Sequence, residues 1–204
     1  MNRNGFHLSP GLEWVVFLRR FVRSPRTVGA IAPSSRSLAD RMVEDVEFLP
    51  GVKLVEFGPG TGALTQAIVD RLPAEGRYLG IERDPVFVEV LRRRWPHLNC
   101  ACDSVENLLA IAEGKGFLPV DHIVSGLPFA SLPAATTVSI LDAVRDSLRR
   151  GGTFTTFQYV HAYPMRSAVA FRGAMKSRLG PPIRRRLVCV NLPPAFVITW
   201  SKRS

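Results

Sequence analysis

Cysteine and histidine are scarce in this sequence. The three cysteines, Cys100, Cys102 and Cys189, cannot form an even disulfide framework. Cys100 and Cys102 alternate along an expected strand, so their side chains point to opposite faces. The four histidines are scattered without the spacing of metal ligands. We therefore expect reduced thiols, no metal ion and a cytoplasmic protein.

Long apolar runs are also missing. A membrane-spanning helix needs about 20 consecutive apolar residues. The longest candidate, residues 12–22, is interrupted by Glu13, Arg19 and Arg20. No small-residue cleavage site follows it, so we do not interpret it as a signal peptide. The sequence therefore predicts a chain without a spanning helix.

Acidic residues are the rarer charged class. The chain has 17 acidic and 27 basic residues, which gives a formal net charge of +10. Such a surface attracts polyanions, either nucleic acid or the anionic face of a membrane, and charge alone does not choose between them. Hydrophobic residues make up 46% of the 204 residues, which is enough for the core of one compact domain.

Strand and helix patterns alternate from residue 51 onward. Strands are expected at 53–57, 77–81, 98–101, 121–125 and 153–159, and helices at 63–72, 86–95, 134–148 and 166–179. Such alternation produces parallel pairing with right-handed crossovers. Two further strands, 185–190 and 196–200, are separated by a turn and predict a terminal hairpin. The expected fold is an α/β, Rossmann-like, seven-stranded, mostly parallel sheet with a C-terminal antiparallel hairpin.

A glycine-rich turn, EFGPGTGALT at residues 56–65, leaves the first expected strand and enters a helix. Its glycines let the backbone turn tightly and approach a ligand. About 20 residues further on, Glu82 and Arg83 end the next expected strand, where a carboxylate can accept hydrogen bonds from both ribose hydroxyls. The two elements together predict a nucleoside-cofactor site.

Glu56 decides which nucleoside cofactor fits. A carboxylate directly before the first glycine would repel the diphosphate of a dinucleotide, whereas it suits the ammonium group of S-adenosylmethionine. In this respect the turn resembles motif I of the class I methyltransferases. The resemblance implies that fold and S-adenosyl-L-methionine as cofactor. The cofactor-binding residues that it implies in the turn are Glu56, Gly58, Gly60 and Gly62.

The same resemblance extends to the following strands. Glu82 resembles the ribose-binding acid of that family, with Arg83 beside it, and Ser125 is expected to face the cofactor as well. Asp103 and Ser104 stand at the position where members of the family recognise the adenine amino group. Asp103 would accept a hydrogen bond from that group. The alternative is that Asp103 or Ser104 only caps the next helix.

Residues 125–129, SGLPF, follow the fourth expected strand. They resemble the (Asn/Asp/Ser)-x-Pro-aromatic element of amino-group methyltransferases. The hydroxyl or main-chain carbonyls of Ser125 and Leu127 would aim the acceptor lone pair at the methyl group, because orientation provides much of the rate acceleration. Tyr159 ends the fifth strand and is expected to face a methylated ammonium. A proline turn and a core tyrosine are the structural alternatives.

Two families of methyltransferase remain open. The turn resembles that of ribosomal RNA adenine dimethyltransferases, but these carry Asn near Ser125 and an additional helical C-terminal domain for which we find no sequence here. Residues 17–35, 125–129, 151–154 and 191–195 resemble the soluble bacterial phospholipid N-methyltransferases. That resemblance implies methylation of phosphatidylethanolamine toward phosphatidylcholine. Val160 departs from the family pattern, so other amino lipids, such as ornithine lipids, stay open.

Residues 1–50 are expected to form a helical arm ahead of a cofactor-binding domain at 51–204. An apolar stripe beside arginines is typical of a helix that lies in a membrane interface, although it could instead pack on the core. The expected membrane-binding residues are Trp14, Phe17, Leu18, Arg19, Arg20, Phe21 and Arg23. We therefore expect a monomer that associates peripherally with the anionic inner face of the cell membrane and acts on a phospholipid.

A second basic region follows the fifth strand. It consists of Arg166, Arg172, Lys176, Arg178, Arg184, Arg185 and Arg186. Arginine suits bidentate contact with phosphate, so this region could bind lipid phosphates. A solvated basic face or an RNA-binding surface is the alternative interpretation.

Overall fold

The computed structural model describes residues 36–203. Every residue that we expect to bind a membrane lies outside this range: Trp14, Phe17, Leu18, Arg19, Arg20, Phe21 and Arg23. Of the expected N-terminal arm, only residues 36–50 are described. None of the helices within 36–203 combines the length and the apolar character needed to cross a bilayer.

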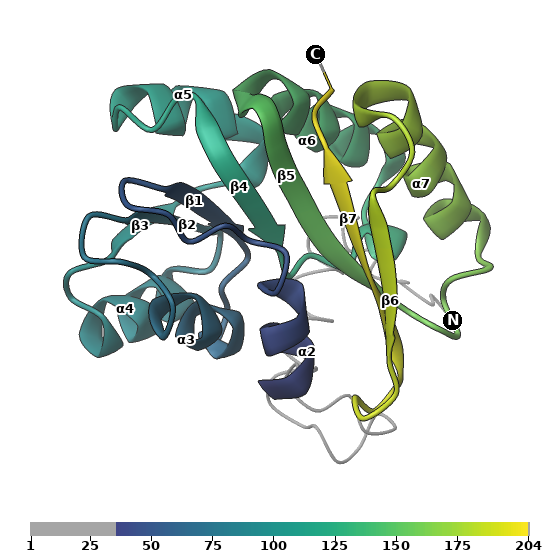
Figure 1. The fold of residues 1–204 in the computed structure, drawn as a ribbon, viewed down its shortest axis with the longest axis horizontal. Coiled ribbons are helices and arrows are strands. Elements are labelled where there is room, and N and C mark those ends of the chain that lie inside the picture. The colour runs from purple at the N-terminus through teal and green to yellow at the C-terminus, as the bar shows by residue number, and fades with distance from the viewer. Residues whose placement is uncertain (1–35, 204) are drawn as a thin grey trace, which may run out of the picture.

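A seven-stranded sheet in the order β3-β2-β1-β4-β5-β7-β6 forms the middle of the molecule (Figure 1). The strands are β1 (Lys53–Phe57), β2 (Arg77–Glu82), β3 (Asn99–Cys102), β4 (Val120–Ser125), β5 (Leu148–Tyr159), β6 (Arg184–Val188) and β7 (Ala195–Ser201). The first five are parallel, and β7 runs antiparallel to both β5 and β6. This topology confirms the predicted fold class.

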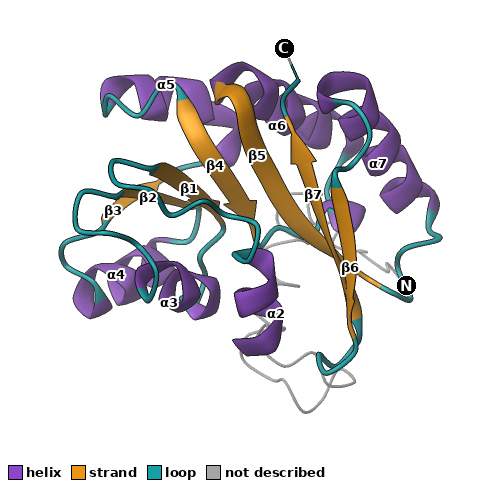
Figure 2. Cartoon of the chain, in the orientation of Figure 1, coloured by secondary structure: helices purple, strands orange, loops and turns teal. Residues whose placement is uncertain are grey.

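Helices cover both faces of the sheet (Figure 2). On one face lie α2 (Arg36–Met42), α3 (Ala63–Val69) and α4 (Pro85–Arg94), and on the other α5 (Leu108–Gly114), α6 (Ala134–Ser147) and α7 (Arg166–Leu179). Two short 3-10 turns, η1 (Val105–Asn107) and η2 (Phe129–Ser131), follow β3 and β4. The central strands β1 and β4 are buried along most of their length, whereas the edge strand β3 is exposed at both of its ends.

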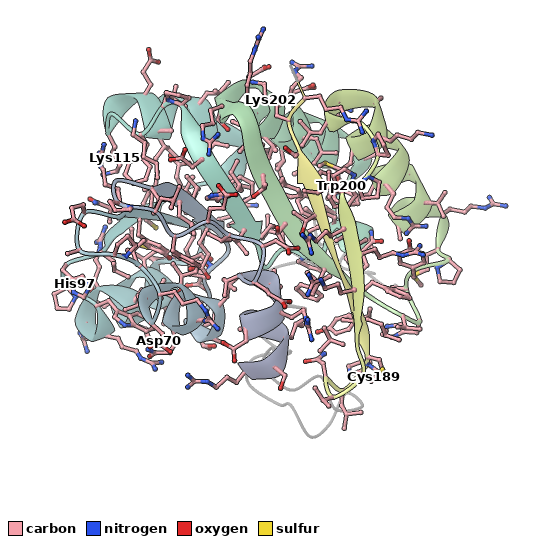
Figure 3. All side chains as sticks on the ribbon, in the orientation of Figure 1. Asp70, His97, Lys115, Cys189, Trp200 and Lys202 are labelled. Atoms are coloured by element: carbon pink, nitrogen blue, oxygen red, sulfur yellow. The ribbon has the colours of Figure 1, made fainter. Side chains whose placement is uncertain are left out.

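Aromatic rings fill the core on the α6 and α7 side. The Phe154 ring on β5 lies 6.4 Å from that of Phe57, 6.0 Å from that of Phe129 and 6.3 Å from that of Trp200. Phe171 of α7 stacks on Phe129 at 4.5 Å. Trp200 lies near the end of β7 (Figure 3). This cluster joins β1, β5, β7, α7 and the turn η2.

The start of β5 differs from the prediction. Helix α6 ends at Ser147, and β5 begins at Leu148 instead of residue 153. Leu148 pairs with Val120, whereas Thr153 pairs with His122, so several residues bulge out opposite Asp121. Arg149 in this bulge forms an ion pair with Asp121. The bulge depends on strand pairing distant in sequence, which local patterns do not reveal.

No bounds were predicted for two of the helices. Residues 108–114 form α5, with Leu108 and Ala112 fully buried against the sheet. Within the expected arm, α2 packs Leu38 and Met42 under the opposite face, with 0% and 1% exposure. The helix expected at 63–72 ends at Val69. These short helices derive their stability from tertiary packing, which a weak local periodicity does not show.

We predict that Phe154→Ala destabilises the fold by about 3–5 kcal/mol, because it leaves a cavity among the rings of Phe57, Phe129 and Trp200. Urea unfolding measures the change. The control Val138→Ala removes an apolar side chain that is 45% exposed on α6, and it should alter the free energy of unfolding by less than about 1 kcal/mol. Equal effects of the two changes would contradict the assignment of Phe154 to the core.

Candidate functional site

The glycine turn lies between β1 and α3, at the carboxyl edge of the sheet. The Gly58 amide donates to the carbonyl of Ile81 on β2 at 3.0 Å, and the Gly62 amide donates to Pro59 at 2.9 Å. Gly58, Gly60 and Gly62 have φ angles of 64°, 54° and 85°, a region that favours glycine. The turn is therefore tied to the neighbouring strand and cannot easily be built from other residues.

The three glycines have different surroundings. A Cβ on Gly58 would lie 2.8 Å from Leu127 Cδ2, and a Cβ on Gly62 would lie 2.5 Å from the Trp95 ring. A Cβ on Gly60 would meet nothing nearer than the Gly58 carbonyl oxygen at 4.0 Å. Gly58 and Gly62 thus permit close packing, while Gly60 leaves its backbone open to a ligand.

Glu82 joins the glycine turn to the end of β2. Its Oε2 accepts a hydrogen bond from the Gly60 amide at 3.0 Å, and its Oε1 accepts one from the Asp84 amide at 2.9 Å. Burial raises the pKa of the Glu82 carboxyl, opposed by hydrogen bonds from the amides of Asp84, Gly60 and Arg83. The Arg83 side chain is exposed. The structure therefore brings together the turn and the acid that the sequence singled out.

Glu56 lies fully buried behind the turn. Its Oε2 accepts hydrogen bonds from Tyr78 Oη at 2.6 Å and Thr65 Oγ1 at 2.8 Å. Its Oε1 is buried and has no partner within residues 36–203. Burial raises the pKa of Glu56 to about 7, against the two hydrogen bonds, and the nearby charge of Glu82 raises it further. An unpartnered buried acceptor of this kind fits the ammonium group of the expected cofactor.

Sequence reasoning did not identify Tyr78 and Thr65 as partners of Glu56. The signal for Tyr78 was present, because Tyr78, Gly80 and Glu82 alternate on one face of β2. Gly80 pairs with Glu56 across the parallel register. A Cβ on Gly80 would lie 2.7 Å from the Tyr78 hydroxyl oxygen, so the glycine makes room for that hydroxyl.

Asp103 and Ser104 follow β3 beside Glu82. The Asp103 amide donates to the Glu82 carbonyl at 3.0 Å, and Asp103 Oδ1 accepts from the Ser104 amide at 2.6 Å and from Asn107 Nδ2 at 2.8 Å. Ser104 is the N-cap of η1, and its Oγ accepts from the Glu106 amide at 3.4 Å. Ser104 thus has the capping role that was the alternative, while Asp103 stands at the same edge as Glu82.

The segment after β4 packs on the glycine turn. Ser125 Oγ accepts from the Leu127 amide at 3.2 Å, and the Ser125 carbonyl accepts from Thr156 Oγ1 at 3.1 Å. The Gly126 amide donates to the Phe57 carbonyl at 2.9 Å. Ser125 itself is fully buried between Phe57 of β1 and Thr156 of β5. The loop is therefore held rigidly, with Ser125 and Leu127 adjacent to the turn.

Tyr159 ends β5 as predicted and is partly buried on the face that α2 and α3 cover. Its ring stacks on His161 at 5.6 Å and meets Phe157 edge-on at 5.2 Å. Burial raises the pKa of Tyr159 to about 12, so its hydroxyl stays protonated at neutral pH. Glu56 faces the same side of the sheet, because its partners Thr65 and Tyr78 lie there.

No metal centre accompanies this site in the described part of the chain. Within residues 36–203 no three histidine, cysteine, aspartate or glutamate side chains form a group that could hold a metal ion. Figure 3 shows Cys189 at the end of the β6–β7 hairpin and His97 on the opposite side of the molecule.

Comparison with known proteins extends the sequence resemblance. Residues 55–154 match the family described as methyltransferase domain. The ornithine lipid N-methyltransferase of Singulisphaera acidiphila is 31% identical over 145 residues, which are 70% of this chain and 76% of that protein. The ribosomal RNA small subunit methyltransferase A of Prosthecochloris aestuarii is 33% identical over 66 residues, 32% of this chain. The chain spans only 24% of the length of that RNA enzyme.

Solved structures share the fold. The 1,6-didemethyltoxoflavin-N1-methyltransferase of Burkholderia thailandensis, with bound S-adenosylhomocysteine, aligns with a TM-score of 0.68 at 15% identity, over 99% of this chain and 94% of that one. The O-methyltransferase of Bacillus cereus in complex with SAH aligns with a TM-score of 0.63 at 12% identity, over 97% and 93% of the two chains.

We predict that Glu82→Gln weakens cofactor binding by about 1.5–3 kcal/mol, because an amide NH₂ group would replace one of two accepting oxygens and the negative charge is lost. Calorimetry with S-adenosylmethionine measures the affinity. The control Glu89→Gln makes the same change at an exposed position of α4, where the carboxylate pairs with Arg93, and should leave the affinity unchanged. Unchanged binding by Glu82→Gln would remove Glu82 from the site.

We also predict that cofactor affinity depends on pH through Glu56. With a pKa of about 7, this carboxyl is mostly protonated at pH 6 and mostly ionised at pH 7.5, and only the ionised form attracts an ammonium group. Affinity should therefore rise about five- to tenfold from pH 6 to pH 7.5. Glu56→Gln should bind more weakly at pH 7.5 and lose this rise. The same pH slope in wild type and variant would exclude Glu56 as its cause.

Proposed function

We propose, on the premise that this chain belongs to the class I S-adenosylmethionine-dependent methyltransferases, that it methylates the amine of a membrane-lipid headgroup. The cofactor of the chain is S-adenosylmethionine. The observation that carries the lipid assignment is the similarity to ornithine lipid N-methyltransferase over 70% of this chain. The RNA enzyme from Prosthecochloris aestuarii, by contrast, matches over 32% of the chain.

Ornithine lipid is the first candidate acceptor and phosphatidylethanolamine the second. Ornithine lipid is named by the relative with the longer match. Phosphatidylethanolamine is the acceptor implied by the resemblance of residues 17–35, 125–129, 151–154 and 191–195 to phospholipid N-methyltransferases. Both lipids present a primary amine close to an acidic group. One reaction type therefore covers both: up to three methyl transfers to nitrogen.

We assign one group of residues to binding the cofactor and another to orienting the acceptor. When bound, S-adenosylmethionine supplies an electrophilic methyl group. The open Gly60 backbone and the Glu82 carboxylate are placed to hold its ribose, Oε1 of Glu56 to accept from its ammonium, and Asp103 to accept from its adenine. Held in this way, the cofactor would supply its methyl group beside the loop after β4.

Ser125 and Leu127 are placed to orient the acceptor. Their loop packs on the glycine turn, and a Ser125 oxygen would accept from a substrate amine in addition to its present donor, Leu127 or Thr156. The amine must be neutral to attack, so it has to lose a proton. His161, which stacks on Tyr159, is a candidate proton acceptor by its position. Tyr159 offers a π face to the methylated ammonium.

A lipid acceptor places the reaction at a membrane surface. The net charge of +10 favours an anionic surface, and the apolar, arginine-rich stripe of residues 14–23 suits its interface. We propose that the chain acts there as a peripheral enzyme and as a monomer. The inner face of the cell membrane is the surface that supplies both the lipid and the cytoplasmic cofactor.

We predict that labelled methyl groups from S-adenosylmethionine enter ornithine lipid or phosphatidylethanolamine in mixed vesicles containing an anionic lipid. Ribosomal RNA is offered in parallel, and products are separated by chromatography. The Glu82→Gln variant serves as the control for cofactor-dependent transfer. Label in RNA alone would reject the lipid assignment, and label in one lipid alone would identify the headgroup.

A further inference from the structure

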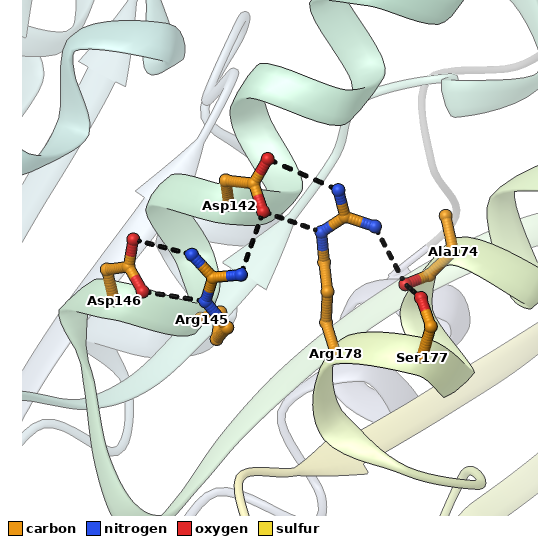
Figure 4. Close-up of polar contacts among 6 residues, drawn as sticks. All are labelled: Asp142, Arg145, Asp146, Ala174, Ser177 and Arg178. Carbon is orange, nitrogen blue, oxygen red and sulfur yellow. Dashed lines mark hydrogen bonds and ion pairs between the residues drawn. The ribbon is translucent and has the colours of Figure 1, made fainter.

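The second basic region does not act as one surface. Arg178 of α7 reaches Asp142 of α6 through Nε at 3.0 Å and Nη2 at 3.2 Å (Figure 4). On the opposite side of β6, Arg184 lies 3.3 Å from Asp45, and Arg186 lies 2.7 Å from Glu44. These three arginines have carboxylate partners and hold secondary-structure elements together. They are therefore not the arginines available to a ligand.

Arg172 is different, because its contacts are neutral. Its Nη1 donates to Gln158 Oε1 at 2.7 Å and to the Tyr163 carbonyl at 2.9 Å, and its guanidinium carbon lies 3.7 Å from the centre of the Tyr163 ring. Gln158 is only 4% exposed, so it holds the arginine from below the surface. Neutral acceptors fix a guanidinium in place and leave its charge uncompensated.

Arg185 approaches the same tyrosine from β6. Its Nη1 donates to Tyr163 Oη at 3.0 Å, and its guanidinium carbon lies 5.9 Å from the Tyr163 ring centre and 5.6 Å from that of Phe196. Among the residues that the structure describes, neither Arg185 nor Arg172 forms an ion pair with a carboxylate. Two guanidinium groups thus converge on one aromatic ring without a counter-charge.

This pair of arginines lies close to the acceptor side of the cofactor site. Gln158, the anchor of Arg172, is two positions beyond Thr156 on β5, and Thr156 pairs with Ser125 of β4. From strand rise and strand spacing, the Gln158 backbone is within roughly 10 Å of Ser125.

We propose that Arg172 and Arg185, held by Tyr163 and Gln158, bind the acidic group of the amine substrate. The inference rests on the proposed function and deepens it. The shared chemistry is an oxyanion: the phosphate of phosphatidylethanolamine or the carboxylate of ornithine lipid. Guanidinium groups contact both through paired N–H donors. With the acidic group fixed there, the amine is directed toward the loop of Ser125.

Exposed apolar side chains beside the two arginines suit the rest of a lipid. Met165 and Val169 share a face of α7 with Arg172 and are 53% and 49% exposed. Leu187 alternates with Arg185 on one face of β6 and is 48% exposed. The two arginines would contact the charged headgroup of a lipid, and the apolar side chains beside them would contact its acyl chains.

Binding of headgroup analogues tests the site without requiring turnover. Calorimetry measures the binding of phosphoethanolamine or Nα-acetylornithine to the full chain in the presence of S-adenosylhomocysteine, and we expect one of these analogues to bind. Arg172→Gln and Arg185→Gln should each weaken this binding at least about tenfold, which equals 1.4 kcal/mol. The control Lys176→Gln removes the same charge from an exposed position on α7 and should change affinity less than about twofold. If neither analogue binds the wild type, or the control matches the arginine variants, the site is refuted.

Kinetics separate this proposal from the proposed function. With the lipid as acceptor, Arg185→Gln should raise KM about tenfold or more, while a long-chain primary amine without an acidic group should be methylated equally by variant and wild type. An equal loss for both acceptors would refute the role of Arg185. If the analogues bind in an arginine-dependent way but no lipid is methylated, the proposed oxyanion site is supported and the proposed lipid methylation is rejected.

Discussion

The hydrogen bond from the Gly60 amide to the buried Glu82 carboxylate connects the glycine turn to the second strand, and the cofactor site depends on it. It fixes the turn in a conformation that only glycines adopt easily. It also places Glu82 near a second buried carboxyl group, that of Glu56. The negative charge of Glu82 contributes to the raised pKa of Glu56. Burial raises the pKa of both acids, and a bound cation with hydroxyl donors would stabilise their ionised forms.

Much of this site could be predicted from the sequence because it is local. The turn, Glu56 and Glu82 stand at the ends of two consecutive strands, and parallel strands that follow each other through a helix usually lie side by side. Ser125 and Leu127 were predictable for the same reason, since β4 pairs with β1 and its end meets the turn. The order of the strands then brings these segments to one edge.

The remaining features depend on contacts distant in sequence. The bulge at the start of β5 requires Asp121, Arg149 and the shifted pairing with β4. The basic residues after β5 look alike in the sequence, yet the structure gives Arg178 a carboxylate partner and leaves Arg172 with neutral ones. Their roles follow from which element each one faces, and that is decided by packing of α7 and β6 on the sheet.

The distribution of charge along the carboxyl edge gives the site a direction. Acidic groups gather around β1 and β2, where Glu56 and Glu82 lie. Beyond β5, Arg172 and Arg185 meet Tyr163 and form no ion pair with a carboxylate of residues 36–203. A zwitterion between the two regions lowers its energy by turning its ammonium toward the acids and its oxyanion toward the arginines. The same orientation directs the nitrogen at the cofactor. A lone amine would bind without this alignment, so the acidic group next to the amine becomes a determinant of reactivity as well as of affinity.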